Sequence, residues 1–211
     1  MEVMSSEELK QHVFRAPAFE SVVNEAVRFL EKTPVHPLPP RKMFIGSGVY
    51  AIYYCGRYAP YRPLAKHNKN EICLPIYIGK AVPPGWRTGR AKLSTSPDLA
   101  NRLRQHASSI KSGTGLDIEN FKCRFIVLTE VEGDLVVPVE AELIRRFKPL
   151  WNTVVDGFGN HDPGKGRYEQ AQSEWDILHP GRLWAKRLRG KSTSAKKVLE
   201  RIKNHMLSLS S

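Results

Sequence analysis

The sequence predicts a mixed α/β (α+β) core that carries a helical N-terminal arm and a basic C-terminal extension. Segments of strand length and segments of helical periodicity follow one another in the order strand, strand, helix, strand, helix. A proline-rich run precedes them, and the chain turns strongly basic after them. We expect the arm at residues 1–43, the core at 44–155 with an insertion at 55–74, and the extension, packed on the core, at 156–211.

The N-terminal arm has the features of a helix followed by a stiff linker. Ser5 and Ser6 precede two glutamates, as a helix start prefers, and apolar residues recur at helical spacing up to Leu30, which predicts a helix over residues 5–32. The next run, TPVHPLPP, cannot continue a helix, because proline lacks the amide donor and restricts the residue before it. We interpret this run as an extended linker.

Two strands are predicted at the start of the core, at residues 44–54 and 75–81. The first is apolar, β-branched and aromatic, and the second is the short segment PIYIGKA. We expect them to be antiparallel neighbours joined by the polar insertion, which is rich in Tyr, Lys and Asn. A basic loop at residues 85–95 follows and contains Arg87 and Arg90.

A helix, a strand and a second helix complete the predicted core. The helix over residues 97–111 is expected to have Ser96 as its capping side chain and Pro97 at its first position. Residues 121–128 alternate as a strand does, with Phe, Cys, Phe and Val on one face. Residues 137–147 have helical periodicity and end shortly before a proline.

The charge balance indicates a polyanionic partner. The formal net charge is +12, from 33 Lys and Arg against 21 Asp and Glu. Basic side chains that neutralise phosphates release condensed counterions, so nucleic acid is the expected partner, and a merely basic protein is the alternative. Between residues 177 and 211 there are nine Lys or Arg and one acidic residue. Arg182 and Lys186 are therefore candidate phosphate contacts in the extension.

Other classes of protein are disfavoured. No window approaches the roughly 20 apolar residues that a transmembrane helix needs, and MEVMSSEELK lacks the basic and apolar regions of a secretory signal. The three cysteines form no C-x-x-C pair, so we expect reduced packing residues of a cytoplasmic protein, not a disulfide set or zinc site.

Two strand tyrosines stand beside glycines, Tyr50 in Gly-Val-Tyr and Tyr77 in Tyr-Ile-Gly. A tyrosine that faces the core is usually a packing residue, and either tripeptide alone occurs readily by chance. Lys80 follows the second motif and adds a cation that could contact phosphate or lower the pKa of a neighbouring phenol.

Arg102 and His106 are spaced to lie side by side on one face of the first core helix. A guanidinium can bind two phosphate oxygens at once, and an imidazole can bond to the same phosphate or relay a proton near neutral pH. For the pair in isolation, a solvated helix face in a basic protein is the favoured interpretation.

Glu140 lies at the edge of the apolar stripe of the second core helix. A carboxylate there is costly unless it is paired or bound to a cation, and Mg²⁺ is often held by one or two carboxylates with phosphate and water. Glu142 is expected to point elsewhere. Asn152 follows the helix and could close a site by hydrogen bonding or cap the turn after the proline.

Taken together and in this order, these residues resemble the GIY-YIG nuclease family over about residues 44–152. The resemblance implies a small three-stranded antiparallel sheet flanked by helices. The matching elements are Gly48-Val49-Tyr50, Tyr77-Ile78-Gly79-Lys80, Arg102 with His106, and Glu140 followed by Pro149 and Asn152.

The resemblance also implies hydrolysis of a phosphodiester with a single Mg²⁺, for which Mn²⁺ can substitute, and no organic cofactor. Glu140 would hold the metal, Tyr50 would carry or relay the proton of the attacking water, and Arg102 would stabilise the developing charge. The remaining three residues would position the water and the phosphate; they are Tyr77, His106 and Asn152.

The 26 residues between Tyr50 and Tyr77 exceed the connection in most of the family. This long connection, together with stretches such as PIYIGKAVPPGWR and KPLWNTVVDGFGNHDPG, makes the sequence similar to the branch of type II restriction endonucleases that cut CCGCGG. That branch implies a bacterial cytoplasmic enzyme that acts on double-stranded DNA as a homodimer on a palindrome. Arg and Lys read guanine well, so Arg87 and Arg90 are candidate DNA contacts.

Two alternatives stay open at this point. One is a repair or homing nuclease of the same family, which the long insertion disfavours. The other is a basic nucleic-acid-binding protein without catalysis, which the presence of every site residue type disfavours.

Overall fold

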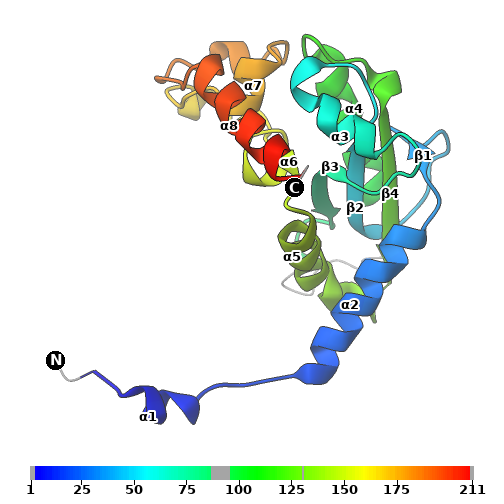
Figure 1. Ribbon diagram of the computed structural model, residues 1–211, viewed down its shortest axis with the longest axis vertical. Helices are drawn as coiled ribbons and strands as arrows, with labels where there is room; N and C mark the ends of the chain where they lie inside the picture. The colour runs from blue at the N-terminus through cyan, green and yellow to red at the C-terminus, as the bar shows by residue number, and fades with distance from the viewer. Residues whose placement is uncertain (1–2, 87–95, 130, 210–211) are drawn as a thin grey trace.

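The computed structural model describes residues 3–86, 96–129 and 131–209, and it has a four-stranded antiparallel sheet with helices on both faces (Figure 1). The strand order is β1-β4-β2-β3. The strands are β1 (His36–Pro37), β2 (Ser47–Tyr54), β3 (Pro75–Ala81) and β4 (Phe121–Leu128). The sequence predicted β3 and β4 with these bounds, and β2 begins three residues later than expected.

The fourth strand corrects the expectation of a three-stranded sheet and of a linker outside it. In β1, His36 pairs with Cys123 of β4, and the amide of Leu38 donates to the carbonyl of Phe121 at 3.3 Å. Prolines hold the backbone extended, which suits a strand, and they are tolerated at an edge because only one side of the strand is hydrogen-bonded. The proline-rich run therefore belongs to the sheet.

The arm contains two helices instead of the single expected helix. They are α1 (Ser6–Lys10) and α2 (Pro17–Lys32), and Pro17 begins α2 because proline is tolerated in the first turn but not inside a helix. Helix α1 buries no residue and leads away from the body of the protein (Figure 1). Helix α2 is part of the fold, because Val23, Val27 and Leu30 pack in one apolar cluster with the sheet.

The alternation of β2 divides the protein into two layers. Val49, Ala51 and Tyr53 face α2 and α5 (Val136–Phe147) on one side of the sheet. The residues between them face α4 (Asp98–Ser112) and α6 (Leu150–Thr153) on the other side. Both faces are covered, so all eight residues of β2 are buried.

The start of α4 differs from the expected cap. Pro97 occupies the N-cap position, and the Ser96 hydroxyl bonds the Asp98 carboxylate instead of a backbone amide. The Ser96 carbonyl accepts from the amide of Gly46, which ties the helix start to the residue just before β2. This contact places α4 beside the strand that carries Tyr50.

The insertion folds onto the end of β2. It contains η1 (Ala59–Tyr61) and α3 (Arg62–His67), followed by the buried Asn68. The Asn68 side chain donates to the carbonyls of Tyr54 and Leu74 at 3.1 and 2.8 Å. These bonds join the two ends of the insertion, so it is a packed element rather than a loose polar loop.

The C-terminal extension packs on the same core. It contains α7 (Glu174–Leu178) and α8 (Ala195–Ser208), whose buried side chains join the cluster that includes Tyr50. Its members from the extension include Trp175, Val198, Ile202 and Met206. Further short 3-10 turns include η3 (Ile118–Asn120), η4 (Gly133–Leu135), η5 (Lys165–Arg167) and η6 (Ala185–Arg187). In the described ranges, no helix has both the length and the apolar character needed to cross a membrane.

Candidate active site

The two glycines beside the tyrosines are required by close packing. Tyr50 on β2 lies opposite Gly79 on β3, and a Cβ atom at Gly79 would stand 2.4 Å from the Tyr50 hydroxyl. The phenol can lie over β3 only because Gly79 has no side chain. Gly48 has a φ of +151°, and a Cβ there would stand 2.1 Å from the Ile126 carbonyl oxygen of β4.

The Tyr50 hydroxyl reaches a histidine on α4. Its oxygen lies 2.6 Å from Nε2 of His106, and both side chains are buried, at 0% and 1% exposure. The Tyr77 ring stands beside both, with its centroid 6.3 Å from that of Tyr50 and 5.2 Å from that of His106. Residues from two strands and a helix therefore meet at one point on this face of the sheet.

Arg102 lies one turn before His106 on α4 and reaches the same cluster. Its Nη2 donates to the Gly159 carbonyl at 2.9 Å, and its Nη1 donates to Gln105 at 3.1 Å and contacts Nε2 of His161. Its positive charge lowers the pKa of both Tyr50 and Tyr77, against the effect of their burial. His106 is buried and Arg102 is partly buried, so a fully solvated helix face does not describe this pair.

Burial keeps the central pair neutral near pH 7. It raises the pKa of the Tyr50 phenol well above its ordinary value, and it lowers the pKa of the His106 imidazole well below its ordinary value. The positive charge of Arg102 and its neighbours lowers the pKa of His106 further. A neutral imidazole with a free Nε2 can accept the Tyr50 proton along the 2.6 Å contact.

Glu140 approaches from the opposite layer. It lies on α5, forms an ion pair with Lys80 of β3, and its side chain is 16% exposed. Its negative charge raises the pKa of both Tyr50 and Tyr77. Glu140 therefore acts electrostatically on the two phenols from the other side of the edge strand β3. Glu142 points elsewhere, as expected, and pairs with Arg145 on the side of α2.

The donor set suits a hard metal ion bound together with substrate. Within the described residues, no group of three or more His, Cys, Asp or Glu is placed so that it could hold a metal ion. Mg²⁺ is commonly held by one or two carboxylates, with substrate phosphate and water completing its shell. The Glu140 carboxylate, whose charge acts on both phenols, fits this manner of binding.

Comparison with known families shows to which family the chain belongs. Residues 42–206 match the family described as the Eco29kI GIY-YIG domain. This chain belongs to that family. The match confirms the resemblance inferred from the ordered motifs, and it extends into the C-terminal helix α8. Eco29kI, the restriction enzyme for which the family is named, recognises CCGCGG. A search among curated proteins gave no match.

The family is one of DNA nucleases. In this chain the side chain of Asn152 binds the backbone of β3. In this Eco29kI-type domain its Oδ1 accepts from the amide of Ile78, and its Nδ2 donates to the carbonyl of the same residue, both at 2.8 Å. Ile78 lies between Tyr77 and Gly79 on the outer strand β3. The amide therefore fixes the strand that carries part of the site, and its position relative to phosphate stays a prediction.

The DNA contacts expected of the Eco29kI-type domain have different outcomes. Arg182 was expected to contact phosphate, but it is 4% exposed and its guanidinium is bound to Asp176 and to backbone carbonyls. That expectation is wrong, because the side chain is buried and cannot reach DNA. Lys186 is exposed on η6 and stays a prediction. Arg87 and Arg90 lie outside the described residues.

Sequence reasoning missed two residues of the cluster. His161 contacts Arg102, and the Phe158 ring stacks on His106 with centroids 4.6 Å apart and planes at 19°. Both lie in the segment GFGNH, whose composition is that of an ordinary turn. Their only signal was membership in a stretch similar to the family, and nothing local distinguishes them from surface residues.

Proposed function

We propose that this Eco29kI-type domain is a type II restriction endonuclease that makes a Mg²⁺-dependent double-strand break at the palindrome CCGCGG. The observation that carries the proposal is the 2.6 Å contact between the Tyr50 hydroxyl and His106, with an arginine and a carboxylate acting on the same phenol. Proton transfer, stabilisation of developing charge and a metal ligand are the functions that phosphodiester hydrolysis needs.

Tyr50 acts as a proton relay in this proposal. It passes its hydroxyl proton to Nε2 of His106 and takes the proton of the attacking water. The raised pKa of Tyr50 and the lowered pKa of His106 mean that the pair starts as neutral phenol and neutral imidazole. No phenolate has to form before substrate binds, and the positive charge of Arg102, which lowers the pKa of Tyr50 against the effect of burial, stabilises the negative charge as it develops.

In this proposal Arg102 and Lys80 contact the scissile phosphate directly, and Glu140 acts on it through the metal ion. Arg102 offers a guanidinium beside the phenols, where reduced access of water strengthens its interaction with a phosphate. Glu140 would hold the metal, and Mg²⁺, or Mn²⁺ in its place, would supply positive charge that stabilises the phosphate and the leaving oxygen. Lys80 balances the Glu140 carboxylate in the free protein through their ion pair.

Double-stranded DNA is the proposed partner, bound by two copies of the chain. A palindrome presents the same half-site twice, so a twofold dimer reads it with identical surfaces. The net charge of +12 and the basic residues of the extension, including the exposed Lys186, supply contacts to the phosphate backbone. Arg87 and Arg90 are retained as proposed DNA contacts.

A digestion experiment tests the proposal. Purified protein with Mg²⁺ is incubated with a plasmid that carries CCGCGG, and discrete fragments are expected. A shift in a gel without nicking would favour a non-catalytic binding protein. Cutting that ignores CCGCGG would favour a repair or homing nuclease.

Replacement of the metal ligand tests the assignment of the site. Glu140→Gln removes the carboxylate charge at nearly constant size, so cleavage is expected to be lost while DNA binding is retained. Glu142→Gln is the matched control two residues along α5, where the side chain pairs with Arg145 on the other side, and it is expected to cleave at the wild-type rate. Unchanged cleavage by Glu140→Gln would remove Glu140 from the site.

A further inference from the structure

One short loop of the C-terminal half touches the candidate site in three ways. We call residues 157–161 the clamp loop. The Gly159 carbonyl accepts from Arg102 at 2.9 Å, His161 contacts the same guanidinium, and the Phe158 ring stacks on His106. The loop therefore contacts both side chains that α4 contributes to the site.

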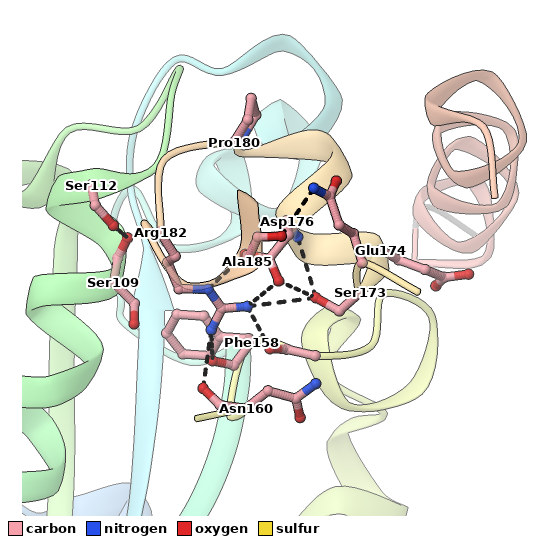
Figure 2. A network of polar contacts seen from close by, with 12 residues as sticks. Ser109, Ser112, Phe158, Asn160, Ser173, Glu174, Asp176, Pro180, Arg182 and Ala185 are labelled. Atoms are coloured by element: carbon pink, nitrogen blue, oxygen red, sulfur yellow. Dashed lines mark hydrogen bonds and ion pairs between the residues drawn. The ribbon is translucent and has the colours of Figure 1, made fainter. Parts of the chain in front are cut away.

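The opposite side of the clamp loop is bound by Arg182. Its guanidinium donates to the carbonyls of Gly157, Phe158 and Asn160 at 2.9, 3.1 and 3.2 Å (Figure 2). Asp176 of α7 accepts from Nε and Nη2 of the same arginine, both at 2.7 Å. Five N–H groups face three carbonyls and two carboxylate oxygens, so the donors of this buried side chain are fully used.

Two arginines thus bind the carbonyls of one loop. Arg182 takes those of residues 157, 158 and 160, and Arg102 takes that of Gly159 between them. We propose that Arg182 is a positioning residue of the nuclease site, which acts through the clamp loop to set the orientation of Arg102 and His106. This inference rests on the proposed function, because it assigns a supporting role within that site.

The close packing of the clamp loop on both sides allows a change at Arg182 to affect Arg102 and His106. A Cβ at Gly157 would stand 2.0 Å from the Cβ of Ser173, and a Cβ at Gly159 would stand 2.7 Å from the Tyr77 hydroxyl. A loop packed this closely on both sides moves as a unit when one side is released. Lysine cannot replace Arg182, because three donors on one nitrogen cannot serve two carboxylate oxygens and three carbonyls at once.

The test compares two arginine variants in the full chain. Arg182→Lys keeps the positive charge beside Asp176 but loses the planar guanidinium with its five donors. Arg124→Lys is the matched control, because Arg124 also donates to backbone carbonyls, of Thr33 and Ile72, but on the other face of the sheet. The single-turnover rate on a CCGCGG duplex with Mg²⁺, the affinity for the duplex with Ca²⁺ and the melting temperature are measured for each.

We expect Arg182→Lys to cleave at least about tenfold more slowly at unchanged affinity, since a misplacement of about 1 Å can cost on the order of 100-fold. Arg124→Lys should melt earlier and cleave at the wild-type rate. In an Arg102→Lys background, Arg182→Lys should cause a smaller further loss than in the wild type, because the part of its effect that passes through Arg102 is already gone. Losses that multiply, or a folded Arg182→Lys with wild-type rate, would overturn the inference.

A second variant decides the matter if Arg182→Lys does not fold. His161 is exposed, so His161→Ala leaves the packing intact and removes only the contact with Arg102. A lower rate at unchanged affinity supports the clamp loop, and an unchanged rate overturns it. A wild-type protein that binds and never cuts contradicts the proposed function itself, whereas a cutting enzyme that ignores these variants contradicts only the role of Arg182.

Discussion

His179 joins the C-terminal extension to the core, and its burial makes the stability of the protein depend on pH. It follows α7, and its Nε2 lies 2.6 Å from the Tyr61 hydroxyl of the insertion. Its Nδ1 donates to the Thr114 carbonyl at 3.0 Å, which leaves Nε2 free to accept the phenol proton. Protonation would destroy the second bond and place a charge in a fully buried position.

The size of this effect follows from the pKa of His179. Burial lowers that pKa from 6.5 to about 4, although the bond to Thr114 opposes the shift. Between these two values the unfolded chain binds a proton that the folded protein does not, so the free energy of unfolding decreases as pH falls. A difference of 2.5 pKa units corresponds to about 3 kcal/mol, present above pH 6.5 and lost by pH 4.

Urea denaturation between pH 7.5 and pH 4 measures the effect in the wild type and in His179→Gln. The glutamine amide can still accept from Tyr61 but does not titrate, and the other histidines are common to both proteins. Across this pH range, the free energy of unfolding of the wild type should fall by about 3 kcal/mol relative to that of the variant. Curves that stay parallel would refute the assignment of this proton linkage to His179.

Three further predictions concern the site. Gly79→Ala places a Cβ 2.4 Å from the Tyr50 hydroxyl, so cleavage should fall on the order of 100-fold with DNA binding retained, and wild-type kinetics would contradict the packing argument. Asn152→Ala removes both bonds to Ile78 and should destabilise the protein by about 1–3 kcal/mol in urea denaturation, whereas an unchanged midpoint would deny that role. Because the pKa of His106 lies well below its ordinary value, cleavage should persist as pH falls past 6.5, and a rate that halves at 6.5 would show a solvated imidazole.

The regular elements were predictable where the signal is local. The apolar alternation of residues 121–128 and the compact run PIYIGKA gave strands with the observed bounds. The two-residue strand at His36 has no pattern of its own, because it exists only through pairing with Cys123 of β4. The break before Pro17 was visible as a proline inside the predicted helix, and apolar periodicity was given too much weight against it.

The candidate site was likewise predictable only in part. The order of the motifs predicted Tyr50, Tyr77, Arg102 and His106 as site residues, and the structure brings these four residues together on one face of the sheet. The basic extension misled at Arg182, because a count of positive residues cannot tell a buried cation from an exposed one. Its partners include the Gly157 carbonyl, 25 residues earlier, and contacts of this kind leave no local pattern.

The paired bonds between Asn152 and Ile78 have a consequence for assembly. A carboxamide carries the same donor and acceptor as a peptide group, so this side chain satisfies both outward-facing backbone groups of Ile78 at the edge of the sheet. An incoming chain would find those groups taken, which blocks the edge-to-edge joining that open strands invite. In the proposed dimer on a palindrome, we therefore expect the two copies to meet elsewhere than at Ile78 of β3, and Asn152 protects this position next to Tyr77 from pairing with another strand.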